Sequence, residues 1–120
     1  MFDGDNDPQT RHYGAFAGSV NVGCVSFMLR PWDDEPAFQL RGMATAPQWQ
    51  RRGAGAKLLA FAEDDIARNT DLTTLWCNAR VEAVSFYEKF GWQVASEQFF
   101  IPGVGPHHKM LRQLSANSRR

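Results

Sequence analysis

A short segment at positions 50–56, with the sequence Gln-Arg-Arg-Gly-Ala-Gly-Ala, has the composition of an anion-binding loop. It lies between an apolar run that predicts a strand and a periodic segment that predicts a helix. The free N–H groups at a helix N-terminus and the positive end of its dipole attract phosphate oxygens. Glycines let the backbone approach such a ligand closely, and Arg51 and Arg52 can add charge-assisted hydrogen bonds. The segment therefore predicts a site for a phosphate or a pyrophosphate.

Two well-known phosphate loops do not match this segment. A Walker loop needs Lys followed by Ser or Thr after its last glycine, but Gly55 is followed by Ala56 and then by Lys57 and Leu58. The dinucleotide-binding fingerprint needs a third glycine at the position of Leu58. Taken alone, the segment fits a solvated glycine-containing loop as well as it fits a binding loop.

The elements that position this loop follow from the spacing of apolar residues. Strands are predicted at residues 13–16, 20–29, 38–45, 72–77, 93–101 and 108–114, and helices at 55–68 and 83–90. Gly23 marks a predicted bulge in the second strand. In the first helix Leu59, Ala62 and Ile66 form the apolar face, and Glu63 is placed outside it. The order of elements predicts a mixed α/β layer in which helices cover a sheet.

Composition excludes several classes of protein. The 120 residues carry 13 Lys plus Arg and 13 Asp plus Glu, so no excess of positive charge favours nucleic acid or an anionic membrane surface. With 43% hydrophobic residues, the length fits one domain over 1–120, with 1–10 and 115–120 expected to be flexible.

Other features of the sequence address location and metal binding. No apolar run reaches the ~20 residues of a membrane helix, and the acidic stretch 1–8 is unlike a signal peptide, so a cytoplasmic protein is expected. Cys24 and Cys77 lack any metal-ligand spacing, so both are expected to be buried thiols and no metal site is predicted.

Two motifs together resemble the GCN5-related N-acetyltransferase (GNAT) superfamily. The loop 50–56 is similar to the acetyl-CoA loop Gln/Arg-x-x-Gly-x-Gly/Ala, with Gln50, Gly53 and Gly55 at its defined positions. About thirty residues later, the segment 83–92, Ala-Val-Ser-Phe-Tyr-Glu-Lys-Phe-Gly-Trp, resembles the helix Ala-x-x-Phe-Tyr-x-x-x-Gly-Phe of that family. Strings at 40–45, 75–80 and 101–107 resemble a bacterial subgroup of this family.

The resemblance implies a fold, a reaction and a set of residue roles. The implied fold is an α/β (α+β) domain with a mixed, mostly antiparallel sheet, one splayed pair of strands and flanking helices. In the implied reaction an amine of a small molecule or peptide attacks the thioester of acetyl-CoA directly, with no metal, and coenzyme A leaves as thiolate. The backbone N–H of Met43 would stabilise the oxyanion, and Tyr87 would protonate the departing sulfur. The implied cofactor contacts are Met43, Ala44, Thr45, Gln50, Arg51, Arg52, Gly53, Ala54, Gly55, Ala56, Asn78, Arg80 and Phe86.

The sequence departs from the family pattern in three places. The central strand has Gln39, Arg41 and Met43 where many members carry a glutamate base, so His107 is the candidate base or substrate contact, ahead of His108 and His12. Arg80 stands where many members have an asparagine that contacts the cofactor, and it could instead reach an acidic substrate or lie on the surface. The first strand and first helices of the family are also missing.

The sequence leaves the acceptor side of the protein open. The chain could be a naturally short variant, an incomplete chain, or a protein whose neighbour, such as a second copy, completes the pocket. An acetyl-CoA-dependent N-acetyltransferase is the first hypothesis, and a non-catalytic acyl-CoA-binding module or subunit is the alternative. A structural domain that binds anions incidentally is the third.

Overall fold

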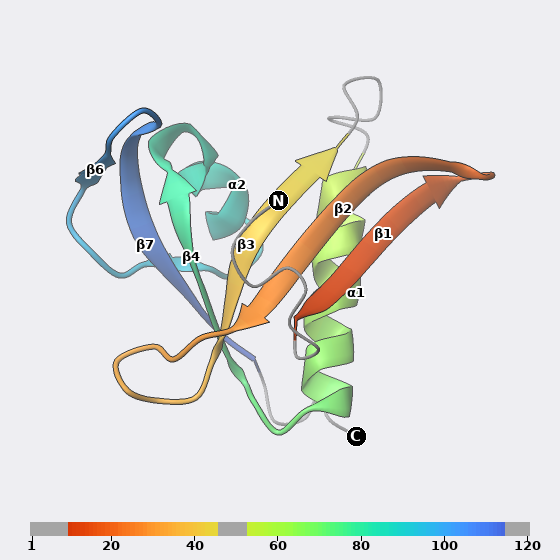
Figure 1. Ribbon diagram of the computed structural model, residues 1–120, viewed down its shortest axis with the longest axis horizontal. Coiled ribbons are helices and arrows are strands. Elements are labelled where there is room, and N and C mark those ends of the chain that lie inside the picture. The colour runs from red at the N-terminus through yellow and green to blue at the C-terminus, as the bar shows by residue number, and fades with distance from the viewer. Residues whose placement is uncertain (1–9, 46–52, 115–120) are drawn as a thin grey trace.

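The computed structural model describes residues 10–45 and 53–114, which form one twisted sheet and its covering helices (Figure 1). The strands are β1 (Arg11–Ala17), β2 (Val20–Leu29), β3 (Phe38–Thr45), β4 (Thr74–Arg80), β5 (Gln93–Val94), β6 (Phe99–Ile101) and β7 (Gly105–Gln113). Their order is β1-β2-β3-β4-β7-β5, and β6 pairs with β7. Only β3 and β4 pair in parallel among these strands. The mixed, mostly antiparallel sheet expected from the sequence is confirmed.

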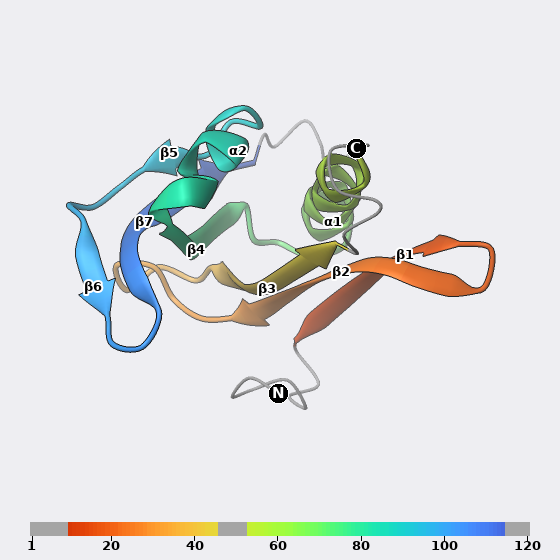
Figure 2. The same cartoon turned by 90° about the horizontal axis from the view of Figure 1, so that it is seen from above.

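The helices lie on one side of this sheet (Figure 2). They are α1 (Ala54–Asn69), the 3₁₀ turn η2 (Val81–Ala83) and α2 (Val84–Glu88). The apolar face of α1, including Leu59 and Ile66, packs against Val25 and Phe27 of β2 and Leu75 of β4 in the core. The opposite face of the sheet carries no helix in the described part of the chain, and nothing there precedes β1 as a strand or a helix.

Two irregularities bend the central strands. The register of β1 against β2 shifts where Ala15 pairs with Gly23 and Phe16 pairs with Asn21, which confirms the bulge predicted near Gly23. A second bulge places Arg41 of β3 as the extra residue, because Ser26 of β2 pairs with Gly42 and Phe27 pairs with Leu40. The extra residue rotates the strand locally, as bulges beside active sites commonly do.

The parallel ladder between β3 and β4 is short and ends where the bulge begins. It joins Phe38, Gln39 and Leu40 to residues 75–77 and goes no further. Beyond Leu40 the two strands diverge, as Figure 1 shows, so the sheet opens into a V between them. The splayed pair of strands that the sequence led us to expect is therefore present, and it is β3 and β4.

Some local predictions from the sequence were wrong. The strand predicted at 93–101 is two short strands, β5 and β6, on different parts of β7, and the predicted helix at 83–90 begins as a 3₁₀ turn. Cys24 is exposed, because its neighbours Gly23 and Val25 take the buried side of β2. Glu63 is 8% exposed, not solvated, because Trp92 and Arg112 reach its carboxylate.

Candidate active site

A cleft of about 530 Å³ lies between the diverging ends of β3 and β4. Its walls come from both splayed strands, from α2 with the turn before it, and from β7. The lining residues are Leu40, Arg41, Gly42, Met43, Cys77, Asn78, Ala79, Arg80, Ala83, Tyr87 and His107. The two side chains that the sequence singled out for acid–base chemistry, Tyr87 and His107, thus line one cavity although they lie on different elements.

Tyr87 lies on α2 at the base of this cleft and is 8% exposed. Its ring packs against Phe86 and Trp92, with ring centroids 5.3 Å away in each case. Burial, with the neighbouring Cys77 as a smaller cause, raises the pKa of the phenol above its usual value. Burial also raises the pKa of the Cys77 thiol to about 12. At neutral pH both groups are therefore protonated, and Tyr87 is available as a proton donor.

His107 lies on β7 and is 4% exposed. Its Nδ1–H donates a hydrogen bond of 2.7 Å to the carbonyl of Gly105, and its ring packs against Phe99 with centroids 5.9 Å apart. Since a carbonyl can only accept, Nδ1 carries the proton, and Nε2 of the neutral ring is left with a lone pair. The hydrogen bond that ties the turn to the backbone thus also fixes the tautomer that a base requires.

The other two histidines do not line the cleft. His12 Nδ1 lies 2.8 Å from Ser26 Oγ at the exposed surface of β1 and β2. His108 points to the opposite side of β7 from His107, and its Nδ1–H donates to the carbonyl of Ser96 at 3.1 Å. Of the three histidines in the sequence, only His107 is among the described residues that line the cavity with Tyr87.

A second groove, of about 400 Å³, adjoins the cleft at Met43, which lines both. It runs past the start of α1, and its lining residues are Met43, Thr45, Gly53, Gly55, Ala56, Phe86, Lys89 and Phe90. Gly53 precedes α1 with a φ of 82°, a left-handed conformation that glycine adopts readily. The helix begins at Ala54, and its N-cap Gly53 offers no side-chain cap, so among the described residues the N-cap supplies no partner to the first N–H groups.

The shape of this groove depends on the absence of a side chain at Gly55. A Cβ atom there would lie 3.3 Å from Met43 Cε and 3.3 Å from Thr45 Oγ1, so it would crowd the groove. A helix that begins at the groove, a glycine that leaves space beside Met43 and Thr45, and an adjoining cleft are features that suit a phosphate-bearing thioester. The described residues therefore fit a ligand such as acetyl-CoA.

The sequence did not single out Lys89 and Phe90, which line the same groove as Phe86. They follow Phe86 by three and four positions, the spacing that places residues on one face of a helical turn. That spacing was the available signal for them. Lys89 is exposed at the rim, where its ammonium adds positive charge to a groove that has no Asp or Glu among its described lining residues.

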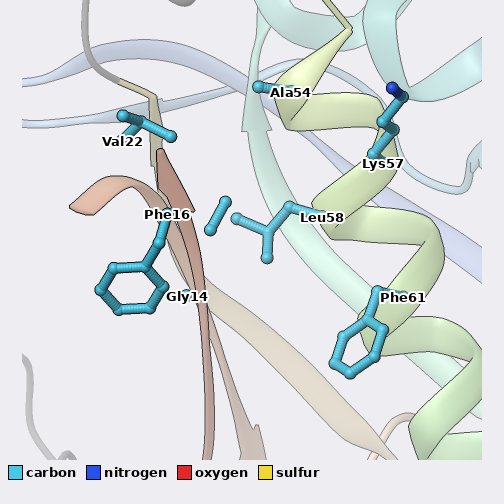
Figure 3. A pocket seen from close by; sticks show the side chains of 8 residues that line it. Gly14, Phe16, Val22, Ala54, Lys57, Leu58 and Phe61 are labelled. Atoms are coloured by element: carbon cyan, nitrogen blue, oxygen red, sulfur yellow. The ribbon is translucent and has the colours of Figure 1, made fainter. Parts of the chain in front are cut away.

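Other predicted cofactor contacts lie apart from this groove. Ala44 is exposed on β3. Ala54 lines a separate hollow of about 530 Å³ between α1 and the β1–β2 hairpin, where Phe16 and Phe61 flank Leu58 (Figure 3). Gln50, Arg51 and Arg52 lie outside the described residues.

Asn78 and Arg80 do line the cleft, but not the groove. Asn78 Oδ1 accepts a hydrogen bond of 3.0 Å from Lys109 Nζ. Arg80 is exposed at the end of β4. The structure thus brings Met43, Asn78 and Arg80 together with the two acid–base candidates.

Two kinds of site have no counterpart in residues 10–45 and 53–114. No group of three or more His, Cys, Asp or Glu side chains is placed there to hold a metal ion. None of the helices in these ranges combines the length and the apolar composition needed to cross a membrane.

Comparison with known proteins identifies the family. The model of the acetyltransferase (GNAT) domain matches residues 3–114. YitI of Bacillus subtilis, described as an uncharacterised N-acetyltransferase, is 34% identical over 106 residues, which are 86% of this chain and 70% of YitI. YyaT of Bacillus subtilis is 29% identical over 69 residues, covering 58% of this chain and 45% of YyaT.

Solved structures share the fold. An aminoglycoside 6′-N-acetyltransferase complexed with coenzyme A superposes with a TM-score of 0.75 at 14% identity, over 89% of this chain and 74% of that one. The ribosomal-protein-S18-alanine N-acetyltransferase of Escherichia coli gives a TM-score of 0.72 at 20% identity, over 92% of this chain and 72% of that one. With the domain match, the relative YitI and the cleft described above, the chain belongs to the GNAT family of acetyltransferases and is an N-acetyltransferase.

Proposed function

We propose that this protein transfers the acetyl group of acetyl-CoA to an amine of a small molecule or peptide. The observation that carries the proposal is that Tyr87 and His107 line the same cleft, which adjoins the groove at the start of α1. When bound, acetyl-CoA supplies an activated acetyl group on a thiol that can leave. The first turn of α1 and Lys89 would hold its phosphates, and residues 43–45 of β3 would lie along its pantetheine arm.

Each residue of the cleft has one task in this proposal. His107 Nε2 accepts a proton from the incoming ammonium or amine, directly or through water, because Nδ1 is already committed to Gly105. Tyr87 donates its phenolic proton to the departing sulfur. The N–H of Met43, which follows the bulge at Arg41, would stabilise the negative charge that develops on the thioester oxygen.

The alternative is a module that binds acyl-CoA without turnover, alone or completed by a partner chain. The pairing of a protonated phenol with a fixed imidazole tautomer favours the enzyme, since binding alone requires neither. That 1–120 forms one domain, acts in the cytoplasm and associates as a homodimer are predictions that accompany the proposal.

The test combines a binding measurement with a turnover measurement. Calorimetry measures the Kd for acetyl-CoA, and release of free thiol is followed while a panel of amines is screened. We expect binding together with amine-dependent thiol release. Binding without release by any amine would support the binding module, and no binding at millimolar acetyl-CoA would contradict both. Sedimentation at several protein concentrations checks the homodimer.

A further inference from the structure

The charges around the cleft point to the kind of amine that enters it. Arg41 comes from the bulge of β3, where its Nη1 lies 3.9 Å from Met28 Sδ, and Arg80 comes from the end of β4, so each of the splayed strands contributes an arginine to the lining. The described residues that line the cleft include no Asp or Glu. A guanidinium binds a planar carboxylate through two parallel hydrogen bonds, and it repels an additional ammonium.

Arg80 lies on the side of the sheet away from the helices. Residues of β4 alternate, and Cys77 and Ala79 take the core side against α1 and α2, which leaves Asn78 and Arg80 on the open face seen in Figure 2. The groove at the start of α1 lies on the helix side. This placement separates Arg80 from the proposed phosphate contacts and puts it on the side from which an acceptor enters.

Arg80 is also the direct neighbour of the proposed base. In the antiparallel ladder of β4 and β7, Arg80 pairs with His107. Directly opposed residues of such a ladder have side chains on the same face, with Cβ atoms about 4.5–5.5 Å apart. An amine held at His107 Nε2 therefore has a guanidinium within reach of a carboxylate that is a few bonds away in the same molecule.

The next pair on the same face of the ladder adds a third cation. Asn78 pairs with Lys109, whose Nζ donates to Asn78 Oδ1 and lies 4.8 Å from the ring centroid of Trp76. A carboxylate does stand nearby, because Asp33 and Lys109 line a neighbouring hollow of about 280 Å³. It is not among the residues that line the cleft.

From this arrangement we propose that the acceptor is an amino-carboxylate, a small molecule with an anionic carboxylate close to its amine, held by Arg80, with the positive charge of Arg41 on the facing strand as a second attraction. The inference rests on the proposed acetyltransferase function and names its substrate class. Polyamines and aminoglycosides bring further ammonium groups to the two guanidinium groups and are poor acceptors for that reason.

Matched pairs of acceptors test the inference. Amino acids and the corresponding amino acid amides have the same amine and side chain and differ in the carboxylate. We expect kcat/KM for the acids to exceed that for the amides by about tenfold or more, since hydrogen bonds between charged groups are worth 1.5–3 kcal/mol and 1.4 kcal/mol is a factor of ten. Equal or better turnover of the amides, or of a polyamine such as spermidine, would overturn the inference and leave the proposed function intact.

Variants assign the effect to Arg80. Arg80→Gln should raise KM for the acids about tenfold, leave the amides unchanged and keep the Kd for acetyl-CoA within twofold. Arg80→Lys keeps the charge and should restore part of the preference. The control is Arg68→Gln, because Arg68 is an exposed partner of Asp64 on α1. If Arg80→Gln instead raises the Kd for acetyl-CoA and leaves the ratio of kcat/KM for acids and amides unchanged, Arg80 contacts the cofactor and the inference is contradicted.

A binding readout keeps the inference testable if no amine is acetylated. In that case the proposed function fails, and N-acetyl amino acids and their amides are titrated into the protein in the presence of coenzyme A. Tighter binding of the acids than of the amides, lost in Arg80→Gln, supports a carboxylate site in the cleft. Equal binding of the two series contradicts it.

Discussion

Tyr87 and His107 reach the same cleft from opposite sides of the sheet, and their surroundings suit opposite tasks. The phenol is buried beside Cys77 and is protonated at neutral pH, whereas in the neutral form of His107 the bond from Nδ1–H to Gly105 leaves the lone pair on Nε2. One group thus has a proton to give, and the neutral form of the other has a lone pair that can accept one. The family motif predicted Tyr87, and the absence of a glutamate on the central strand led to His107, but the tautomer of His107 depends on a turn geometry that neither signal encodes.

Removing the phenolic hydroxyl of Tyr87 tests its role as acid. In Tyr87→Phe we expect kcat to fall by about 100-fold or more, because general acid catalysis contributes 10²–10⁴-fold, while the Kd for acetyl-CoA stays within twofold. The protein offers a matched control in its other tyrosine. Tyr13 OH donates to Asp65 Oδ2 at 2.6 Å between β1 and α1, away from the cleft.

Tyr13→Phe should cost about 1 kcal/mol of stability and leave kcat unchanged. Thiol release and urea unfolding measure the two effects. A Tyr87→Phe enzyme with the turnover of the unmodified protein would remove the acid from the mechanism.

At the scale of elements, the start of α1 determines the shape of the second groove, in which we propose that the phosphates bind. Gly55→Ala places a Cβ against Met43 and Thr45, and Met43 must then move toward the groove and the cleft that it lines. Alanine favours the helix by up to about 1 kcal/mol relative to glycine, so stability should hold or rise while the Kd for acetyl-CoA increases about tenfold.

This divergence between stability and affinity separates a binding role of Gly55 from a structural one. Calorimetry and urea unfolding measure the two quantities. Arg68→Gln is the control, because Arg68 lies in the last turn of α1, where it pairs with Asp64 at the exposed surface. Unchanged affinity in Gly55→Ala would mean that the ligand does not approach this turn.

The carboxylate of Glu63 connects α1 to Trp92, which follows α2, and to Arg112 of β7. Its titration makes the stability of the protein depend on pH. Its carboxylate accepts from Trp92 Nε1 at 2.9 Å and from Arg112 Nε at 3.3 Å, yet burial dominates and raises the pKa of this carboxyl above its usual value. The folded protein therefore takes up a proton at a higher pH than the unfolded chain does. Stability from this group is present below the unfolded pKa and is lost as pH rises through the folded pKa.

Replacing this carboxyl should remove that dependence. In Glu63→Gln the amide still accepts from Trp92, but nothing titrates. We expect the unmodified protein to gain stability relative to Glu63→Gln between pH 7 and pH 5, measured as the difference in free energy of unfolding in urea at the two values. A difference that shrinks on acidification would show that Arg112 outweighs burial and that the folded pKa is lowered.

The elements show how far sequence reasoning reaches. The periods of two and 3.6 located β2, β3 and α1 well, because each has a continuous apolar pattern of its own. They missed the division of 93–101 into β5 and β6 and the exposure of Cys24, since these depend on which strand lies alongside. Glu63 was misplaced for the same reason: its partners are 29 and 49 residues away in the chain. The end of the β3–β4 ladder, which creates the cleft, likewise follows from long-range register.

At the scale of the whole molecule, the cleft lies where β3 and β4 diverge within the sheet. One face of the sheet is covered by α1 and α2 (Figure 2). By the alternation of β4 and its pairing with β7, Arg80, His107 and Lys109 lie on the other face. The cleft between β3 and β4 joins the two faces. The net charge of zero does not reveal this arrangement, because it gives no positions, whereas the described lining of the cleft includes Arg41 and Arg80 and no Asp or Glu.

This architecture predicts which backbone amides ligand binding protects from hydrogen exchange. The parallel ladder of β3 and β4 ends at the pair Leu40 and Cys77. If the pantetheine arm lies between the splayed strands, it provides hydrogen-bond partners for backbone amides beyond that pair. Acetyl-CoA should then slow hydrogen exchange within residues 42–44 of β3, 78–80 of β4 and the first turn of α1. Strand β1 serves as the internal control. It lies at an edge of the sheet, separated from the cleft by β2, so its hydrogen exchange should change little. Hydrogen exchange measured by mass spectrometry with and without acetyl-CoA tests this prediction. Protection centred on the hollow between α1 and the β1–β2 hairpin would place the ligand there and contradict the proposed groove.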